Sequence, residues 1–170
     1  MKSNKNIVLI GMMSSGKSTI GRILAKKLNL RFFDIDLIIE NKLKTKISEI
    51  FKKKGEAFFR NLEEKTALQF IEKTQSVISL GGGGFVNEII RKNIKKKSIS
   101  IWLDWSPKTL INRIRKNKKR PIALNLNDIE LKELMINRSK IYSKSKYKIE
   151  CEGMTKTEII KKIIHIYEAN

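Results

Sequence analysis

Cysteine, histidine and proline are scarce in this chain, and each scarcity narrows the possible classes of protein. Of 170 residues, one is cysteine, one is histidine and two are proline. A single cysteine, Cys151, excludes an internal disulfide and fits a reducing, cytoplasmic compartment. One cysteine and one histidine, His165, supply too few ligands for a zinc site. The sequence therefore predicts neither a disulfide-stabilised secreted domain nor a zinc protein.

Long apolar runs are also missing from the sequence. No stretch approaches the roughly 18 apolar residues that a membrane span requires. The first six residues are polar and lack the apolar segment of a secretory signal. We therefore expect a cytoplasmic protein that makes no contact with a membrane. A length of 170 residues and a hydrophobic content of 41% favour a single domain over 1–170.

Acidic residues are too few to balance the basic ones. The chain has 17 acidic and 37 basic residues, which gives a formal net charge of +20. Such an excess is compatible with nucleic acid, a phosphate or a carboxylate as partner. The lysines are scattered along the whole chain, however, so we interpret most of the charge as solvated surface. In this lysine-rich background, an arginine indicates a position that needs a planar, bidentate donor.

Short apolar segments alternate with amphipathic ones along the chain. Gly55 is expected to separate two of the amphipathic segments. This alternation predicts an α/β fold, with a parallel sheet of about five strands flanked by helices on both faces. Strands are predicted at 6–10, 31–33, 76–80, 98–103 and 147–150, and helices at 17–28, 34–44, 48–54, 57–72, 107–115, 128–143 and 155–169.

A phosphate-binding motif lies between the first predicted strand and the first predicted helix. Residues 11–18, GMMSSGKS, match G-x-x-x-x-G-K-[ST]. Its glycines let backbone N–H groups converge on phosphate oxygens at the positive end of the helix. Lys17 is expected to reach the β- and γ-phosphates, and the Ser18 hydroxyl to ligate Mg²⁺. The predicted contacts to a nucleoside triphosphate come from Ser14, Ser15, Gly16, Lys17, Ser18 and Thr19.

Two other classes of nucleotide-binding protein fit less well. GTPases read the base with N-K-x-D, and residues 117–120, NKKR, fail at the last position. A motor ATPase needs a carboxylate at the end of a strand, and Asp104 stands at such a place. A polar residue in the turn before the Pro107 helix is the simpler interpretation of Asp104. The phosphoryl acceptor must then be sought from other segments.

Carboxylates follow the second predicted strand, beside the phosphate loop. Ligands of parallel sheets bind outside the carboxyl ends of the strands. Asp34 and Asp36 can divide their roles there, one facing hydrated Mg²⁺ and the other a substrate hydroxyl. The alternative is that they complement the dipole of the following helix.

Arginines and glycines supply further candidates. Arg60 lies beside two phenylalanines in 55–63, GEAFFRNLE, which suits a small anionic substrate, although an ion pair with Glu63 is the alternative. Glycines 81–84 end the third strand and can present backbone N–H groups to a ligand or form a flexible turn. The basic stretch 113–120 can close over a triphosphate, or be an exposed loop or a nucleic-acid patch. Arg138 adds another arginine on the following helix.

Six segments together resemble the shikimate kinase family over nearly the whole chain. The resemblance implies ATP-dependent phosphorylation of the 3-hydroxyl of shikimate, giving shikimate 3-phosphate and ADP, in the pathway to aromatic amino acids. It also implies a monomer with the P-loop kinase fold of nucleoside monophosphate kinases. A substrate-binding segment is expected at about 34–62 and a mobile lid at about 113–127. The matching segments are 11–19, 32–36, 55–64, 79–84, 120–122 and 138–142.

The resemblance assigns roles on the nucleotide side of the site. Lys17 and Ser18 serve the phosphates and Mg²⁺, and Asp34 supports the metal through water. Arg113 is similar to the residue that stacks on adenine. Arg120 is similar to the lid arginine that contacts the phosphates. Residues Lys17, Asp36 and Arg120 are implied to be catalytic.

On the acceptor side, the resemblance assigns both charge and backbone. Asp36 is implied to bind the ring hydroxyls and to orient the attacking oxygen. Two arginines are implied to clamp the carboxylate of shikimate, with glycine backbone closing the pocket. The implied acceptor-binding residues are Asp36, Arg60, Gly81, Gly82, Gly83 and Arg138.

Two alternative functions remain for comparison. Gluconate kinase-like enzymes also phosphorylate a hydroxylated carboxylate, but lack as a pattern the DID, FFR and GGG segments seen here. A nucleic-acid-stimulated ATPase would use the +20 charge, yet would leave Asp36 and the two arginines without a purpose. The expected partners are therefore ATP, shikimate and Mg²⁺, without nucleic acid. Trp102, Trp105, Cys151 and His165 are interpreted as packing residues.

Overall fold

Five short parallel strands form the centre of the molecule. The computed structural model describes residues 4–116 and 126–170. The strand order is β2-β3-β1-β4-β5, and every neighbouring pair is parallel. The sheet confirms the predicted α/β class. The strands are β1 (Asn6–Ile10), β2 (Arg31–Asp34), β3 (Ser76–Ser79), β4 (Ser98–Asp104) and β5 (Tyr147–Glu150).

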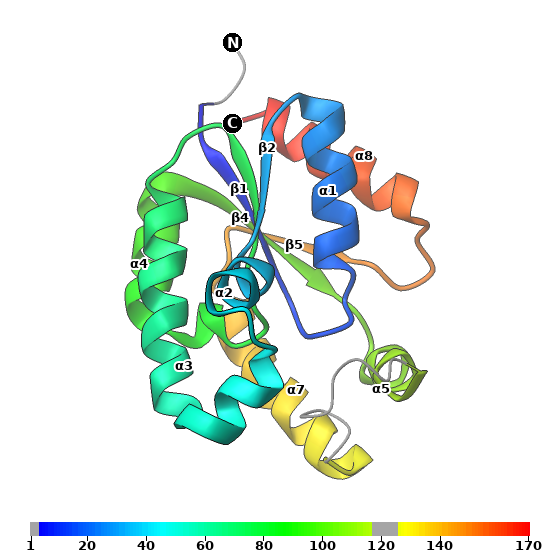
Figure 1. Cartoon of the computed structure of the whole chain (residues 1–170). Helices are drawn as coiled ribbons and strands as arrows, with labels where there is room; N and C mark the ends of the chain where they lie inside the picture. Colours follow the sequence, from blue (N-terminus) through cyan, green and yellow to red (C-terminus); the bar gives the residue numbers. More distant parts are fainter. Residues whose placement is uncertain (1–3, 117–125) are drawn as a thin grey trace.

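Helices cover both faces of the sheet. Figure 1 shows α1 and α8 on one face and α3 and α4 on the other. Side chains alternate along each strand, so Ile7 and Leu9 join one apolar cluster, and Val8 and Ile10 the other. The helices are α1 (Lys17–Leu28), α2 (Ile35–Leu43), α3 (Ile47–Ile71), α4 (Glu88–Lys97), α5 (Pro107–Lys116), α7 (Asp128–Tyr142) and α8 (Lys156–Glu168), with a short 3-10 helix, η1 (Gly84–Val86).

Helix α4 was missed by the sequence analysis, which assigned no element to 85–97. The signals were present in the chain. The side chain of Asn87 caps the helix by accepting hydrogen bonds from the N–H groups of Ile89 and Ile90. Ile90 and Ile94 are buried, while the lysines between and after them face outward. A narrow apolar stripe among lysines was therefore enough to form a surface helix.

Gly55 interrupts α3 as predicted. Its backbone has φ 80° and ψ 168°, a conformation open almost only to glycine. The two predicted helices, 48–54 and 57–72, are the two parts of α3 on either side of this kink. The kink turns the first part of α3 back toward α2, in the segment expected to bind substrate.

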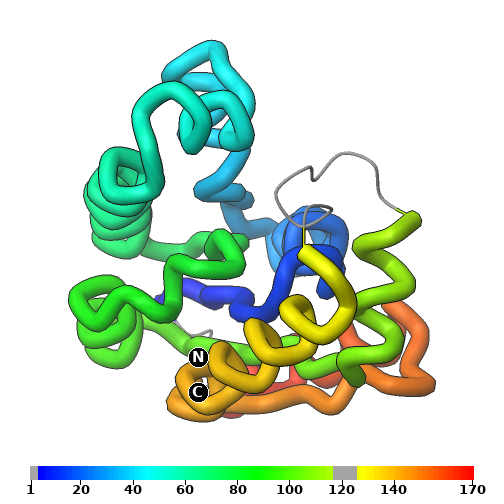
Figure 2. Tube along the Cα trace, turned by 90° about the horizontal axis from the view of Figure 1, so that it is seen from below, coloured from blue at the N-terminus to red at the C-terminus, as the bar shows by residue number. Residues whose placement is uncertain are grey.

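The carboxyl ends of the strands meet at one edge of the sheet. Figure 2 looks at this edge from below and shows the α2–α3 connection on one side, α5 on the other, and the start of α1 between them. Because parallel strands place their loops together, this edge gathers segments from distant parts of the chain. Among residues 4–116 and 126–170, no helix has the length and apolar content of a membrane span.

Candidate active site

The loop between β1 and α1 has the backbone that a phosphate-binding motif requires. Gly11, Ser14 and Gly16 all have positive φ. A Cβ atom at Gly11 would lie 2.9 Å from the carbonyl oxygen of Leu103, so only glycine fits there. Gly16 is the N-cap residue of α1, and no side chain caps this helix. The first N–H groups of α1 are thus directed toward the site, where anions bind best.

Lys17 is folded over this loop. Its Nζ donates hydrogen bonds to the carbonyl oxygens of Gly11 and Met12, both at 2.8 Å. The side chain is largely buried, with 8% of the residue exposed. The ammonium group is therefore held at the loop that is expected to bind phosphate.

Ser18 and Asp34 lie together beside the loop. The Ser18 hydroxyl donates to Asp34 Oδ2 at 2.5 Å. Asp34 also caps α2, since its Oδ1 accepts from the N–H of Leu37 at 3.3 Å. The helix-terminal alternative for Asp34 is thus correct in part, and the second carboxylate oxygen faces the loop. A hydroxyl and a carboxylate next to a phosphate site are the protein ligands that Mg²⁺ prefers, so these residues fit the predicted ion.

A cavity of about 290 Å³ collects most of the predicted nucleotide residues. Asp36 lines it on the side of α2 and Arg113 on the side of α5. Ser79 and Leu80, at the end of β3, also line it and were not predicted. The complete lining is Ser14, Gly16, Lys17, Ser18, Thr19, Asp34, Asp36, Ser79, Leu80 and Arg113.

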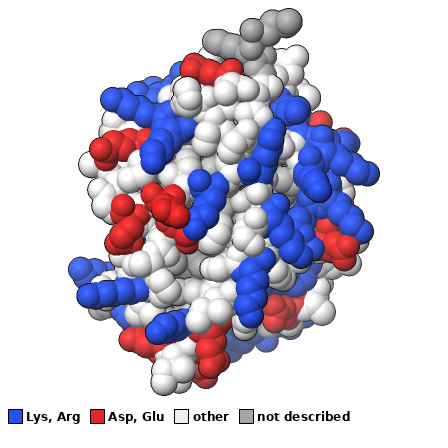
Figure 3. All heavy atoms as spheres, turned by 180° about the vertical axis from the view of Figure 1, so that it is seen from behind, with Lys and Arg blue, Asp and Glu red and all other residues white. Residues whose placement is uncertain are grey.

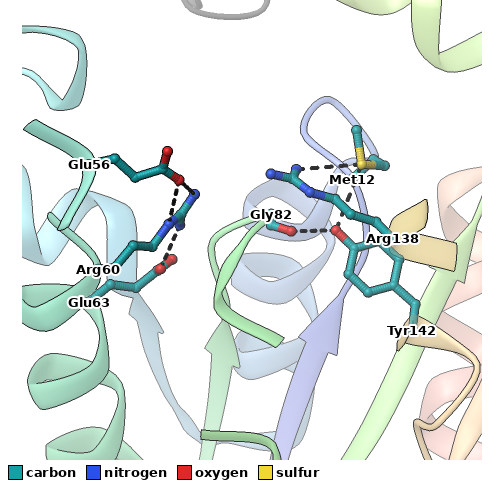
Figure 4. A network of polar contacts seen from close by, with 7 residues as sticks. All are labelled: Met12, Glu56, Arg60, Glu63, Gly82, Arg138 and Tyr142. Carbon is teal, nitrogen blue, oxygen red and sulfur yellow. Dashed lines mark hydrogen bonds and ion pairs between the residues drawn. The ribbon is translucent and has the colours of Figure 1, made fainter. Parts of the chain in front are cut away.

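On the acceptor side, Arg60 is held by two glutamates of its own helix (Figure 4). Its Nη1 donates to Glu63 Oε2 at 2.7 Å and its Nε to Glu56 Oε1 at 3.1 Å. The predicted alternative of an Arg60–Glu63 ion pair is confirmed. Burial raises the pKa of the Glu63 carboxyl, and the neighbouring Arg60 charge opposes that shift. The Arg60 side chain stays 31% exposed, so its pairing with Glu63 leaves it open to a ligand.

Arg138 faces the same region from the opposite side. Figure 4 shows Arg60 from α3 and Arg138 from α7 on either side of Gly82. Nη1 of Arg138 lies 3.6 Å from the sulfur of Met12. Tyr142, one turn further along α7, donates to the carbonyl oxygen of Gly82 and contacts the same sulfur at 3.7 Å. Burial raises the pKa of Tyr142 to about 12, so its hydroxyl keeps the donated proton.

The glycine segment fits closely between these charged groups. A Cβ atom at Gly81 would lie 2.5 Å from Asp36 Oδ1 and 2.6 Å from Glu63 Oε1. At Gly82 it would lie 3.3 Å from Arg138 Nη1. A side chain at Gly81 would therefore displace one or both carboxylates, and glycine lets the backbone pass directly beside them. The structure thus brings together all the predicted acceptor residues, from α2, α3, α7 and the segment after β3.

Several other predictions have definite outcomes. Arg120 lies outside the described residues, as does most of the expected lid. Asp104 forms an ion pair with Lys148 of β5 at 3.1 Å, which favours its interpretation as a structural residue. Trp102 and Cys151 are buried, and their predicted packing roles are confirmed. His165 is exposed on α8.

Sequence reasoning named the Arg60–Glu63 ion pair but gave no role to Tyr142 or Met12, which also support the site. The spacing Arg60-x-x-Glu63 signals an intrahelical pair, and Tyr142 stands one helical turn after Arg138. No pattern in the sequence indicated that the sulfur of Met12 would contact Arg138 and Tyr142. Trp105 packs against both apolar clusters, as predicted. It also makes a polar contact that was not predicted, because its indole N–H donates to the carbonyl oxygen of Ser15 at 3.0 Å.

Comparison with known proteins identifies the family. The shikimate kinase family model matches residues 13–168. Shikimate kinase of Persephonella marina is 42% identical over 161 residues, covering 94% of this chain and 97% of that protein.

Solved structures agree over the same length. Shikimate kinase from Acinetobacter baumannii in complex with shikimate is 30% identical, with a TM-score of 0.90, and the match covers 97% of this chain and 93% of that one. Shikimate kinase from Aquifex aeolicus is 37% identical, with a TM-score of 0.83 and 94% of each chain covered. On the family model and these near full-length matches, the chain belongs to the shikimate kinase family.

Proposed function

We propose that this chain transfers the γ-phosphoryl group of ATP to the 3-hydroxyl of shikimate, giving shikimate 3-phosphate and ADP. One observation carries the proposal: Asp36 lines the cavity at the loop 11–18, and its carboxylate lies beside Gly81, next to the glycines that Arg60 and Arg138 approach. The relative from Acinetobacter baumannii, matched over nearly the whole chain, is in complex with shikimate. These findings support an acceptor that is small, hydroxylated and anionic.

The acceptor site matches the chemistry of shikimate. Arg60 and Arg138 flank Gly82, so two guanidinium groups can bind the substrate carboxylate by charge-assisted hydrogen bonds. The backbone of the glycine segment closes this side without side chains. Asp36 lines the cavity beside the phosphate loop, and its carboxylate lies next to the glycine segment, which supports a role in binding the ring hydroxyls.

The nucleotide site supplies alignment and positive charge. The backbone of Ser14, Ser15 and Gly16 is proposed to bind phosphate oxygens, with Thr19 adding a contact. Lys17 is proposed to neutralise the β- and γ-phosphates. Ser18 and Asp34 would hold Mg²⁺, which would offset the negative charge of the phosphates. Phosphoryl transfer asks the protein mainly for such positioning and electrostatic stabilisation.

Asp36 is proposed to take part in the transfer step itself. The 3-oxygen of shikimate forms a bond to the γ-phosphorus, and the bond from that phosphorus to the bridging oxygen of ADP breaks. Asp36 orients the hydroxyl and accepts its proton. Arg120 is proposed to stabilise the charge that develops on the transferred group, and Arg113 to contact adenine.

We propose that the enzyme is a monomer, as the family resemblance implies. The buried, single Cys151 fits the cytoplasm, where thiols stay reduced.

ADP release from Mg·ATP should be measured with shikimate, quinate, gluconate, AMP and RNA offered separately. We expect release with shikimate. Release with gluconate alone would instead support a gluconate kinase-like enzyme, and release with RNA alone a nucleic-acid-stimulated ATPase.

A further inference from the structure

Trp105 joins the phosphate loop to the start of α5. It lies in the turn between β4 and α5, half-buried, and contacts both apolar clusters. Its indole N–H donates to the carbonyl oxygen of Ser15 at 3.0 Å. The guanidinium carbon of Arg113 lies 3.7 Å from the centroid of its ring. One side chain thus contacts both Arg113 in the wall of the nucleotide cavity and Ser15 in the phosphate loop.

The contact with Arg113 is unusually close for this molecule. The other arginine–ring distances in the described part of the chain are 5.3–5.8 Å. A guanidinium at 3.7 Å rests directly on the indole, the best aromatic partner for a cation. Arg113 also lines the cavity. The indole therefore contacts the guanidinium on one side, while a ligand in the cavity can reach it on another.

The hydrogen bond to Ser15 acts on the phosphate loop itself. The carbonyl of Ser15 and the N–H of Gly16 belong to one planar peptide unit and point in opposite directions. Fixing the carbonyl therefore fixes the direction of the Gly16 N–H. Gly16 is the N-cap residue of α1, and no side chain makes a capping hydrogen bond there.

The turn that carries Trp105 is itself anchored. The carboxylate of Glu152 accepts from the Ser106 N–H at 3.1 Å and from the Thr109 hydroxyl at 2.7 Å. These bonds join the start of α5 to the segment after β5 and lower the pKa of Glu152. The indole therefore projects from a fixed turn rather than from a freely moving loop.

We propose that Trp105 is a positioning residue of the nucleotide site. Its ring holds the Arg113 guanidinium flat, with one face left for a purine base, and its N–H orients the Gly16 amide toward the phosphates. This inference rests on the proposed function only in assigning the base to Arg113. Its ligand class is a purine nucleotide, independent of the phosphoryl acceptor.

The test measures ADP binding by titration calorimetry, without an acceptor. Trp105→Leu removes the ring and the N–H, whereas Trp105→Phe keeps a ring and loses only the N–H. We expect the Kd for ADP to rise about 5- to 10-fold in Trp105→Leu and about 2- to 3-fold in Trp105→Phe. Trp102→Phe, at the buried tryptophan of β4, is the matched control and should leave that Kd within about twofold.

Three readouts separate positioning from general packing. In a background of Arg113→Ala, Trp105→Leu should add only the smaller effect of the lost N–H. The Kd for shikimate should stay unchanged in Trp105→Leu. In the Trp102→Phe protein, ADP should change the fluorescence of Trp105. In the Trp105→Phe protein, the emission of Trp102 should not respond.

Contrary outcomes are equally clear. An ADP affinity within twofold of the original in folded Trp105→Leu would overturn the inference, and so would equal losses of ADP and shikimate affinity. If Trp105→Leu does not fold, the ADP affinity of Trp105→Phe and the fluorescence of Trp105 in the Trp102→Phe protein test the inference instead. The role would then be rejected if ADP left that fluorescence unchanged and bound to Trp105→Phe with unchanged affinity. Normal ADP binding without shikimate-dependent turnover would reject only the proposed acceptor.

Discussion

Tyr142 fixes the glycine backbone at the scale of single residues. Its hydroxyl donates to the carbonyl of Gly82 from a buried position, and its pKa of about 12 keeps it protonated. Tyr142→Phe leaves that carbonyl without its partner, which costs about 1 kcal/mol. We expect the KM for shikimate to rise several-fold with the KM for ATP unchanged. Tyr167→Phe, at a buried tyrosine of α8, is the control; an equal effect there would contradict a local role.

Glu63 gives the acceptor site a dependence on pH. Burial raises the pKa of its carboxyl, so the folded chain binds this proton more tightly than the unfolded chain does. The buried charge therefore costs stability at neutral pH, and the cost disappears as the pH falls through the raised pKa. In that same range Arg60 loses its charged partner.

We therefore expect the KM for shikimate to rise on acidification, beginning at a pH above the ordinary glutamate range. The KM should be measured across pH for the original chain and for Glu63→Gln, which cannot titrate. The acidic rise should be absent in Glu63→Gln. An identical rise in both proteins would assign the effect to another group.

Local spacing explains which residues could be predicted. The phosphate loop, Asp34 and Asp36 depend on neighbours in sequence, and their positions follow from strand–loop–helix order. Tyr142 reaches Gly82 across 60 residues, and Trp105 reaches Ser15 across 90. Such contacts depend on the packing of whole elements, which no local pattern encodes.

At the scale of elements, the kink in α3 is the feature most sensitive to a small change. Gly55 has φ 80° and ψ 168°, and a Cβ atom there would meet nothing within 4 Å. Gly55→Ala therefore tests backbone strain alone, which costs about 1–3 kcal/mol. We expect the free energy of unfolding in urea to fall by that amount. Lys52→Ala, at an exposed lysine in the same part of α3, should change it by less than about 0.5 kcal/mol.

If Gly55→Ala were as stable as the original chain, the kink would not need glycine. The sequence predicted this break because glycine is a poor helix residue between two amphipathic segments. Helix α4 was harder to find because only Ile90 and Ile94 are buried among its lysines. The predicted ends of the other elements coincide with the observed ones or differ from them by one residue.

The arrangement of the whole sheet assembles the site. β3 lies between β2 and β1, so the glycine segment after β3 is placed between the aspartates after β2 and the loop after β1. The sequence predicted parallel strands but did not give this order. Spatial order depends on which helix faces can be buried together, and it explains why α3 and α7 meet across Gly82.

Charge is the other property of the whole molecule. Figure 3 shows lysines and arginines spread over the back of the molecule, with acidic groups between them. The net charge is +20, so the excess positive side chains repel one another in the compact folded state, and salt screens that repulsion. We expect the Tm to rise by a few degrees when NaCl is raised from about 20 to 200 mM, measured by calorimetry. A falling Tm would mean that ion pairs dominate the electrostatics.

The central claim is that Asp36 links the phosphate cavity to the acceptor site. The most direct measurement is the rate of shikimate-dependent ADP release by Asp36→Asn, with ADP affinity measured on the same protein. We predict that kcat falls at least about 100-fold while ADP binds normally. A kcat within a few-fold of the original, in folded protein, would contradict the account.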